Sequence, residues 1–379
     1  MKKILFVSTA SRLWAGGVYY VKNVVYSMFL NKNIVNHFEI HILVDDYHKD
    51  VFQDFETKAI VHTYKYKNDI LLFIRIILLY YLNGISFVYG IPMRRLAKLG
   101  IKGAYWIPDF QHNVYPDFFK PEEIVYRNEH FKRILENSKN TVVLSSNSAY
   151  VDAKKYYDVR TNRIFIVHFV SYLDDVIKNI DEIGEERILT KYNLNDKKYV
   201  YIGNQFWKHK NHIAVAKAIR ILSDKIGLDE LDVVFVFTGD LNDYRNPEYI
   251  KELDMEFKCI RENKKHLLFL GFLPRIDQIC IMKNSVFVIQ PSLFEGWGTV
   301  LEDCKALDKI VLLSDIDVHR EQKYDRCILF DPHDYNQLAN IIYNEVKDNH
   351  HRNINFRREL VKRNAERYSL EIERMLTTM

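Results

Sequence analysis

Short apolar runs that end at a glycine recur along this sequence and constrain its fold more than any other feature. The 379 residues include only 13 glycines, so the positions of these glycines are informative. In the second half, four runs end at Gly203, Gly239, Gly271 and the loop that carries Gly296 and Gly298. Each run is continuously apolar and rich in Val, Ile and Phe, which is typical of strands buried on both faces of a parallel sheet.

Helical patterns lie between these predicted strands. In HIAVAKAIRILSDKI the apolar residues Val215, Ala218, Ile219 and Leu222 recur at the spacing of one helix face. A strand, a glycine turn, a helix and a further strand in this order indicate the βα units of a doubly wound α/β sheet.

The first half repeats the pattern, and its candidate strands are KILFVSTA, FEIHILVD, AIVHTY, GAYWIPD, TVVLSS and RIFIVHF. The charged stretch Asp174 to Asp196 contains no strong strand and separates the two series. The sequence therefore predicts two Rossmann-like parallel-sheet domains, residues 1–176 and 196–349, which face a central cleft and are joined by a linker, 177–195. The basic tail 350–379 is predicted to be helical, too polar for a core, and packed on the outside of the domain pair.

The composition excludes several kinds of protein. With 48% apolar residues the chain can fill a core in each domain, so disorder is not expected. The 54 basic and 50 acidic residues give a net charge of +4, and the basic residues are scattered, which argues against nucleic acid as a partner. The four cysteines form no CxxC pair and have no histidine at zinc-ligand spacing. We therefore expect no metal site, and reduced, buried thiols in a cytoplasmic protein.

Two apolar segments raise the question of a membrane. The opening MKKILFVSTA is short and lacks a cleavage pattern, so we interpret it as a buried first strand rather than a signal peptide. The stretch Asp69 to Leu82 is too short for a spanning helix and contains Arg75. It is either a helix packed in a core or a helix with one face on a membrane.

The residues with the clearest chemical meaning follow the strand SVFVIQ. A loop carrying Glu295, Gly296 and Gly298 leads into a helix that begins near Thr299. The glycines let the backbone approach a ligand, and a helix start presents unpaired N–H groups, so a diphosphate fits there. Carboxylates beside an anion site suit sugar hydroxyls, which makes Glu295 and Asp303 candidate hydroxyl acceptors. The alternative is an ordinary exposed helix start rich in acidic residues.

A second candidate loop follows Gly203. Lys208 and Lys210 precede the next helix, and cations there would neutralise a departing pyrophosphate. The aromatic residues Phe206 and Trp207 in the same loop are expected to be exposed for a partner. Lysines that are merely solvated are the alternative interpretation.

Two further loops belong to the first domain. Gly16 and Gly17 precede a predicted helix without the GxGxxG of a nicotinamide site, and a tight turn explains them as well as a ligand does. The loop WIPDFQHNVYPDFF is dense in aromatic residues, which suits a carbohydrate or leaving-group surface, and its polar residues include Asp109, Gln111 and His112. His112 could equally be a hydrogen-bonded structural histidine.

Together these segments resemble the retaining glycosyltransferases of the GT-B fold, often called group 1 or family 4. The resemblance runs from the Gly16-Gly17 loop to DPHDYNQLANII, residues 331–342. Its most specific part is VFVIQPSLFEGWG, which is similar to the family's strand, PS and EGFG pattern. LLFLGFLP and SDIDVHREQ are similar to the segments before and after it, and WIPDFQH resembles a loop of bacterial surface-polysaccharide members.

The resemblance implies roles for individual residues. The family binds its donor through two acidic residues with seven positions between them. Glu295 matches the first, which contacts the sugar; Asp303 matches the second, which contacts the ribose, and Glu302 is one position short. Lys210 matches a lysine that binds the diphosphate, and the arginine that usually accompanies it is replaced here by one of Asn204, Gln205 and Lys208.

From these matches we predict catalytic roles for Glu295 and Lys210. His112 is predicted to be catalytic as well, because it resembles a histidine that some members of the family place near the reacting sugar. The predicted donor-binding residues are Gly16, Gly17, Gly203, Asn204, Gln205, Lys208, Lys210, Gly271, Phe272, Glu295, Gly296, Trp297, Gly298, Thr299, Val300 and Asp303. The predicted acceptor-binding residues are Trp106, Asp109, Gln111 and His112.

The resemblance also implies a reaction. A hexosyl or deoxyhexosyl group would pass with retention from a nucleotide diphosphate sugar to a lipid-linked glycan, in bacterial surface polysaccharide synthesis such as that of the O-antigen of lipopolysaccharide. Such enzymes usually need no metal or other cofactor. GDP-mannose, dTDP-rhamnose and UDP-hexoses stay open as donors, and a peripheral contact with the inner membrane is a further hypothesis. A sugar-nucleotide epimerase and a non-catalytic donor-binding subunit are the alternative functions.

Overall fold

The computed structural model describes residues 1–8, 15–65, 69–91, 94–260, 263–348 and 356–378. It divides into two compact units. Unit 1 comprises residues 1–113, 122–172 and 359–379, and unit 2 comprises residues 114–121 and 173–358. Residues 114–121 thus belong to unit 2, and residues 359–379 belong to unit 1. The predicted boundaries, which are contiguous in sequence, did not include these two crossings.

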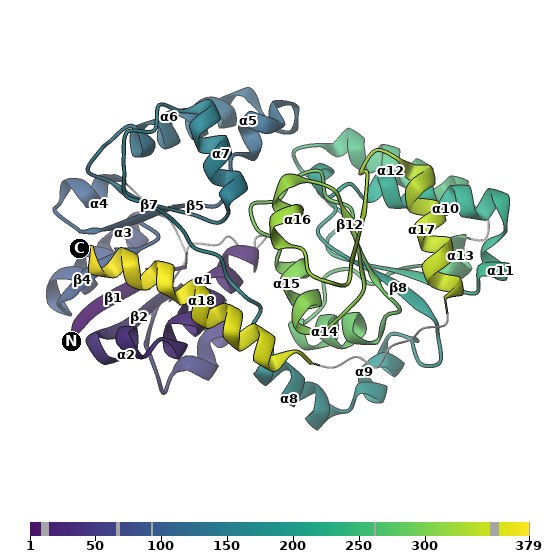
Figure 1. Ribbon diagram of the computed structural model, residues 1–379, viewed down its shortest axis with the longest axis horizontal. Coiled ribbons are helices and arrows are strands. Elements are labelled where there is room, and N and C mark those ends of the chain that lie inside the picture. Colours follow the sequence, from purple (N-terminus) through teal and green to yellow (C-terminus); the bar gives the residue numbers. More distant parts are fainter. Residues whose placement is uncertain (9–14, 66–68, 92–93, 261–262, 349–355, 379) are drawn as a thin grey trace. The chain divides into compact units, whose positions relative to one another are not determined.

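Unit 1 is built on a parallel sheet whose described strands follow the order β3-β2-β1-β4-β5-β6-β7 (Figure 1). The strands are β1 (Lys2–Val7), β2 (Phe38–Asp45), β3 (Ile60–Tyr64), β4 (Ile85–Tyr89), β5 (Gly103–Ile107), β6 (Thr141–Leu144) and β7 (Ile164–Ile166). The helices are α1 (Ala15–Leu30), α2 (Lys32–His37), η1 (Lys49–Phe55), α3 (Asp69–Leu82), α4 (Arg94–Lys98), α5 (Gln111–Val114), α6 (Pro121–Leu135), α7 (Asn147–Tyr156) and α18 (Arg358–Thr377). Chain order reverses between β1 and β4, as in a doubly wound fold.

Strand β1 shows why the sheet is covered on both faces. Leu5 and Val7 pack in one core with apolar residues of α3, among them Leu72 and Ile76. Phe6 points to the opposite face, where its ring stacks on that of Tyr89 at 4.8 Å. Since successive side chains of a strand alternate between faces, a continuously apolar run needs helices on both.

Unit 2 is built on a second parallel sheet, with described strands in the order β10-β9-β8-β11-β12-β13. The strands are β8 (Tyr199–Gly203), β9 (Val234–Thr238), β10 (Leu267–Phe269), β11 (Val288–Gln290), β12 (Val311–Ser314) and β13 (Cys327–Phe330). The helices are η2 (Pro116–Phe118), α8 (Asp174–Ile183), α9 (Glu185–Lys191), η3 (Lys208–Lys210), α10 (His212–Lys225), α11 (Leu228–Leu231), α12 (Pro247–Cys259), α13 (Asn263–His266), α14 (Arg275–Asn284), α15 (Thr299–Ala306), α16 (Asp317–Gln322) and α17 (Tyr335–Lys347). Figure 1 shows α14, α15 and α16 on one face of this sheet and α10, α12 and α17 on the other.

The two Rossmann-like parallel sheets confirm the predicted fold class. Strands β4, β12 and β13 were not predicted, because each is a run of only four or five residues; β12 and β13 also have no glycine at their ends, whereas Gly90 follows β4. The stretch 174–196, predicted to lack a strand, forms α8 and α9.

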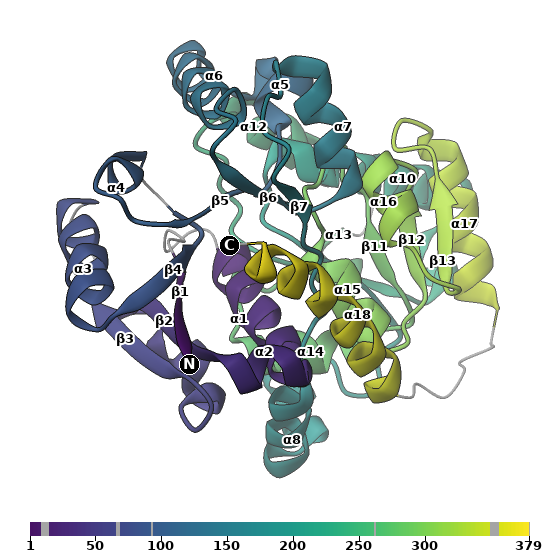
Figure 2. The ribbon, with the colours of Figure 1, turned by 60° about the vertical axis from the view of Figure 1, so that its left-hand side comes forward.

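Helix α18 contributes a buried stripe to unit 1, whereas its composition suggests a segment too polar for a core. Val361, Ala365 and Ile372 on one face are buried. Asn31, at the start of α2, donates hydrogen bonds from Nδ2 to Ser369 Oγ (3.1 Å) and Glu373 Oε2 (2.8 Å). Figure 2 shows α18 beside α1 and α2. The expectation was wrong because the apolar residues, though few, share one face.

The two apolar segments discussed above have different surroundings. β1 is a buried strand, as predicted. Helix α3 buries Leu72, Ile76 and Leu79 but exposes an apolar stripe that includes Ile70, Ile74, Leu78 and Leu82. None of the helices in the described residues has the length and hydropathy needed to cross a membrane.

All four cysteines are free thiols. Cys280 and Cys304 are buried, as expected, but Cys259 is exposed. The expectation was wrong for Cys259 because it lies at the end of α12, outside the apolar face that packs on the sheet.

Candidate active site

The loop Pro291–Gly298 lies at the carboxyl end of β11 and leads into α15. In an open parallel sheet this is the edge where ligands bind. The predicted helix start near Thr299 is confirmed.

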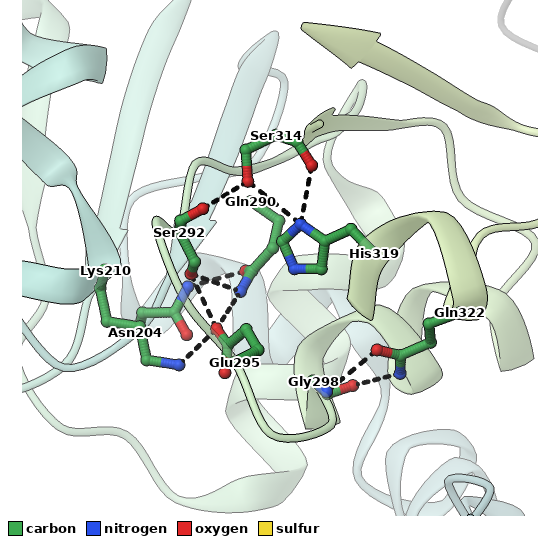
Figure 3. Close-up of polar contacts among 9 residues, drawn as sticks. All are labelled: Asn204, Lys210, Gln290, Ser292, Glu295, Gly298, Ser314, His319 and Gln322. Atoms are coloured by element: carbon green, nitrogen blue, oxygen red, sulfur yellow. Dashed lines mark hydrogen bonds and ion pairs between the residues drawn. The ribbon is translucent and has the colours of Figure 1, made fainter. Parts of the chain in front are cut away.

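Glu295 in this loop is held by three side-chain donors (Figure 3). Its Oε1 accepts hydrogen bonds from Lys210 Nζ (2.6 Å), Ser292 Oγ (2.7 Å) and Gln290 Nε2 (3.0 Å). Only 15% of the Lys210 side chain and 8% of the Glu295 side chain are exposed, so this is a nearly buried ion pair. The structure thus brings together two of the residues predicted to be catalytic, from loops 85 positions apart.

The electrostatics of the site keep Glu295 ionised. Burial alone would raise the pKa of its carboxyl, but Lys210, His209 and His319 lower the pKa to about 2. Burial also lowers the pKa of His209 to about 3 and that of His319 to about 4. At neutral pH the site therefore holds one carboxylate and two neutral imidazoles.

A second layer of polar groups fixes the loop. Asn204 Nδ2 donates to Gln290 Oε1 (2.7 Å), and Ser314 Oγ donates to the carbonyl oxygen of Ser292 (2.6 Å). His319 Nδ1 lies 2.9 Å from the carbonyl oxygen of Ser314, which favours the tautomer that is protonated at Nδ1.

The other ring nitrogen of His319 is available to a ligand. Nε2 is buried and has no hydrogen-bond partner among the described residues. Figure 3 shows the imidazole turned toward the loop that carries Glu295. Buried polar atoms without partners are rare and often face a ligand or a water molecule.

Gln322 at the end of α16 clamps the start of α15. Its Oε1 accepts from the N–H of Gly298 (3.0 Å), and its Nε2 donates to the carbonyl oxygen of Gly298 (2.7 Å) (Figure 3). The same Nε2 also donates to Glu302 Oε1 (3.0 Å). A side chain at position 298 would lie 3.3 Å from this oxygen, so the tight clamp favours glycine. Gly296 and Trp297 occupy the preceding loop, and Trp297 is buried. Thr299 and Val300 form the first turn of α15.

Both candidate ribose ligands are buried in ion pairs. Asp303 is fully buried and receives bonds from Arg275 at both carboxylate oxygens, 2.8 Å at Oδ2 and 2.5 Å at Oδ1. Glu302 Oε1 accepts from Lys305 Nζ at 2.8 Å. Neither carboxylate is presented to solvent, so the assignment of the ribose to Asp303 or Glu302 stays a prediction.

The loop after β8 is arranged by short-range contacts. Gln205 Oε1 accepts from the N–H of Asp240 (2.8 Å), and the N–H of Lys208 donates to Asp243 Oδ2 (2.9 Å). Phe206, expected to be exposed, is buried and stacks on His212 at 4.1 Å. That expectation was wrong because the loop folds back over α10.

Glycines fix the turn that carries Asn204. Gly203 is the last residue of β8, and a Cβ there would lie 2.3 Å from the Tyr201 ring. Gly239 has φ +123°, and a Cβ would lie 2.1 Å from the carbonyl oxygen of Asn204. Gly271 accepts a bond from the N–H of Gly239 (2.8 Å), and the adjacent Phe272 is 65% exposed. Only glycine permits this close approach.

Part of the aromatic loop packs within unit 2 against the Glu295 loop. Tyr115 OH donates to the carbonyl oxygen of Leu293 (3.3 Å), and its ring meets that of Phe294 edge to face. Lys208 Nζ lies 4.8 Å from the centre of the Phe118 ring. Residues 114–121 therefore pack against one side of the loop that carries Glu295.

The predicted acceptor residues lie in unit 1 and make local contacts. Trp106 stacks on Tyr20 at 3.9 Å, and Asp109 Oδ1 accepts from the N–H of Gln111 at the start of α5. His112 is fully buried, with Nε2 3.2 Å from Asn128 Oδ1 and 3.1 Å from Tyr157 OH; burial lowers its pKa to about 4. These surroundings are those of a structural histidine, and a catalytic role of His112 stays a prediction.

Gly16 and Gly17 lie in the first turn of α1, whereas the sequence predicts them in a loop before it. Residues 9–14 of that predicted loop lie outside the described residues. Their contact with a donor stays a prediction.

Several residues of the site were not predicted. Gln290, Ser292, His319 and Gln322 contact or support Glu295 and the start of α15. Two features of the sequence could have indicated them. Gln290 and Ser292 lie at and directly after the end of β11, and His319 and Gln322 lie in SDIDVHREQ, a segment that is similar to the family pattern. Among the described residues no group of three or more His, Cys, Asp or Glu side chains could hold a metal ion.

Residues 184–367 match the family model of glycosyl transferases group 1. This range includes Glu295, Lys210 and the whole polar cluster around them. The match covers most of unit 2 and the first part of α18. Among curated proteins, no sequence gives a significant match.

Several solved structures share the fold of the whole chain. HepE of Anabaena, in complex with UDP and glucose, is 15% identical, with a TM-score of 0.65 and full coverage of both chains. Sucrose-phosphate synthase of Thermosynechococcus elongatus is 13% identical, with a TM-score of 0.70, and covers 100% of this chain and 99% of its own. WaaG, a glycosyltransferase involved in lipopolysaccharide biosynthesis, is 12% identical, with a TM-score of 0.61 and 98% coverage of both. At these identities the likeness shows the GT-B fold alone.

Proposed function

We propose that this chain is a group 1 glycosyltransferase that transfers a hexosyl or deoxyhexosyl group, with retention, from a nucleotide diphosphate sugar to a glycan acceptor. The observation that carries the proposal is the Glu295–Lys210 pair at the carboxyl edge of the unit 2 sheet, beside the start of α15. A carboxylate and an ammonium at one ligand-binding edge provide an acceptor for sugar hydroxyls and a cation for phosphate.

In this proposal the incoming diphosphate competes with Glu295 for Lys210. Lys210 and the first N–H groups of α15 stabilise the negative charge that builds up on the departing nucleotide diphosphate. The Glu295 carboxylate then accepts hydrogen bonds from the sugar hydroxyls, and Ser292 and Gln290 keep it in place. The Lys210 ammonium and the helix start would take the part that a metal plays in other transferases, so we propose a metal-independent reaction without a cofactor.

Retention follows if the acceptor attacks from the face that the diphosphate leaves. In such a front-face reaction the departing phosphate oxygen takes the proton of the acceptor hydroxyl, the glycosidic bond to phosphate breaks, and the new bond forms on the same side of the sugar. The protein supplies positioning and charge stabilisation rather than a nucleophile.

The choice of substrates rests on the named relatives. HepE binds UDP and glucose, so UDP-glucose is the first donor to test, followed by other UDP-hexoses, GDP-mannose and dTDP-rhamnose. WaaG acts in lipopolysaccharide biosynthesis, which supports a lipid-linked acceptor in surface polysaccharide synthesis. We propose that the protein is cytoplasmic and contacts this acceptor at the inner membrane, because α3 exposes an apolar stripe.

The test is the release of free nucleotide from this donor panel, with and without a lipid-linked acceptor. We expect one donor to be turned over, and Glu295→Gln to lower kcat by roughly 100-fold or more. Glu248→Gln is the matched control, since Glu248 is an exposed unit 2 carboxylate that pairs with Lys251. Equal turnover by Glu295→Gln and the wild type would remove Glu295 from the mechanism. No turnover of any donor would favour a donor-binding subunit.

A further inference from the structure

A cavity lies in unit 1, at the amino edge of its sheet. It has a volume of about 490 Å³ and is lined by residues at the amino ends of the strands, among them Lys2 and Ile4 of β1, Ser86 and Phe87 of β4, Gly103 of β5 and Thr141 of β6. Leu376 and Thr378 at the end of α18 form another part of its wall. We call it the amino-edge cavity. Its volume is that of a small-molecule site, yet it lies at the edge opposite to the one where open parallel sheets bind ligands.

The charged side chains of this cavity have one sign. Lys2, Lys102, Lys139 and Arg163 line it, and its described lining contains no carboxylate. None of these four cations forms an ion pair with a described carboxylate. Like charges gathered without counterions raise the local concentration of anions.

A large part of the remaining lining is apolar, beside the polar residues Ser86, Asn140, Thr141 and Thr378. Ile4, Phe87, Tyr105 and Leu376 are buried side chains of the cavity wall, and Ile101 closes it beside Lys102. A purely ionic ligand, such as inorganic phosphate, would leave the apolar part of the cavity lining without a partner. A ligand with a hydrocarbon chain would cover it, at about 0.8 kcal/mol for each buried methylene.

The surface beside the cavity has the same character. Tyr80 OH accepts from the N–H of Lys102 (3.2 Å), and Tyr81 OH donates to the carbonyl oxygen of Leu99 (2.5 Å), so the end of α3 is tied to the rim of the cavity. Residues 70–108 contain five basic residues and no Asp or Glu. The exposed apolar stripe of α3 thus belongs to a basic segment that reaches the cavity.

We propose that the amino-edge cavity binds an anionic amphiphile, with its phosphate or carboxylate head at Lys2, Lys102, Lys139 and Arg163 and its hydrocarbon chain against Ile4, Phe87 and Leu376. The site belongs to unit 1 alone and does not depend on the proposed transferase reaction. The amphiphile is either a free molecule or a lipid taken from an anionic bilayer.

The test is an equilibrium titration of the full chain with decyl phosphate below its micelle concentration. We expect binding that is at least about tenfold tighter than that of inorganic phosphate or decanol. The double variant Lys139→Gln, Arg163→Gln should lose about tenfold or more in affinity, because both side chains are exposed cations of the rim. Lys98→Gln is the matched control, since Lys98 is an exposed cation of α4 that does not line the cavity.

A second variant, Ala97→Trp, fills the cavity from α4 without altering a charge. We expect it to abolish decyl phosphate binding while its circular dichroism spectrum stays that of the wild type. Loss of sedimentation with phosphatidylglycerol vesicles in this variant would assign the ligand to a bilayer, and retained sedimentation would assign it to a free amphiphile; both outcomes support the cavity. Decyl phosphate binding that survives in the folded double variant and in Ala97→Trp would overturn the proposal, as would equal affinity for inorganic phosphate.

Discussion

Glu295 is both a candidate catalytic group and a structural one. Its Oε1 accepts from Lys210, Ser292 and Gln290 in a nearly buried setting. The sequence indicated the first role from the loop and the family pattern. It did not indicate the second, because Lys210 lies 85 positions away and only the fold brings it to Glu295.

Two substitutions of Glu295 distinguish its structural role from its catalytic role. Glu295→Ala leaves the Lys210 ammonium nearly buried without its partner, so we expect it to lower the free energy of unfolding by about 3 to 5 kcal/mol. Glu295→Gln keeps an acceptor for Ser292 and should cost clearly less. Denaturant unfolding of both variants at pH 7 checks this order. An alanine variant as stable as the wild type would show that the pair contributes nothing to stability.

Asp303 and Glu302 are both candidate ribose ligands, and each is also part of a buried ion pair. We predict that Asp303→Asn weakens UDP binding more than Glu302→Gln does, because Asp303 keeps the family spacing from Glu295. Calorimetric titration with UDP measures both affinities. Since Asp303 also pairs with Arg275, its variant must first be shown to be folded at the temperature of the titration. The opposite order of affinities would assign the ribose to Glu302.

At the scale of elements, long periodic or glycine-bounded segments were predictable. Helix α3 covers the predicted stretch Asp69–Leu82, and the strands before Gly203 and Gly239 are where the pattern placed them. The short strands β12 and β13 were missed because pairing with neighbours, rather than their own pattern, makes them strands. Gln322 was missed for a related reason: it lies 24 positions from Gly298, and only the fold brings the two together.

The exposed face of α3 gives a prediction for this element. Ile74→Asp places a charge in the middle of the apolar stripe, where 45% of the native residue is exposed. We expect it to abolish sedimentation with anionic vesicles at low salt without unfolding the protein. Val125→Asp is the control, because Val125 is an exposed apolar residue of α6, outside the stripe. A wild-type protein that does not sediment would end the membrane hypothesis for α3.

At the scale of the whole molecule, the two units have separate sheets and cores but not separate sequences. Residues 114–121 and 359–379 each belong to the unit other than the one their position in the chain suggests. No composition change marks residues 114–121, and the basic composition of the tail set it apart without indicating that it packs in unit 1. The loop 114–121 matters for function, because Tyr115 contacts the segment that carries Glu295.

The stability of the molecule should depend on pH through its buried histidines. Burial lowers the pKa of His212 to about 3, and neither of its ring nitrogens has a partner among the described residues. Because the unfolded chain takes up this proton near pH 6.5 and the folded chain only near pH 3, the contribution of His212 is fully present above pH 6.5 and is lost as the pH falls toward 3.

His212→Phe should therefore make the loss of stability between pH 6.5 and pH 4 shallower. His209 and His319 retain their own contributions, so the dependence should shrink without vanishing. Denaturant unfolding across this pH range is the measurement. An unchanged slope would mean that the folded chain protonates His212 as readily as the unfolded chain does.

The central claim is that a nucleotide diphosphate sugar binds in unit 2 between Lys210 and the start of α15. The most direct measurement is a crystal structure of the protein soaked with UDP. We predict that the diphosphate lies within hydrogen-bond distance of Lys210 Nζ and of the first N–H groups of α15, with Glu295 released from its bond to Lys210. UDP bound elsewhere, with the Glu295–Lys210 pair intact, would contradict the account.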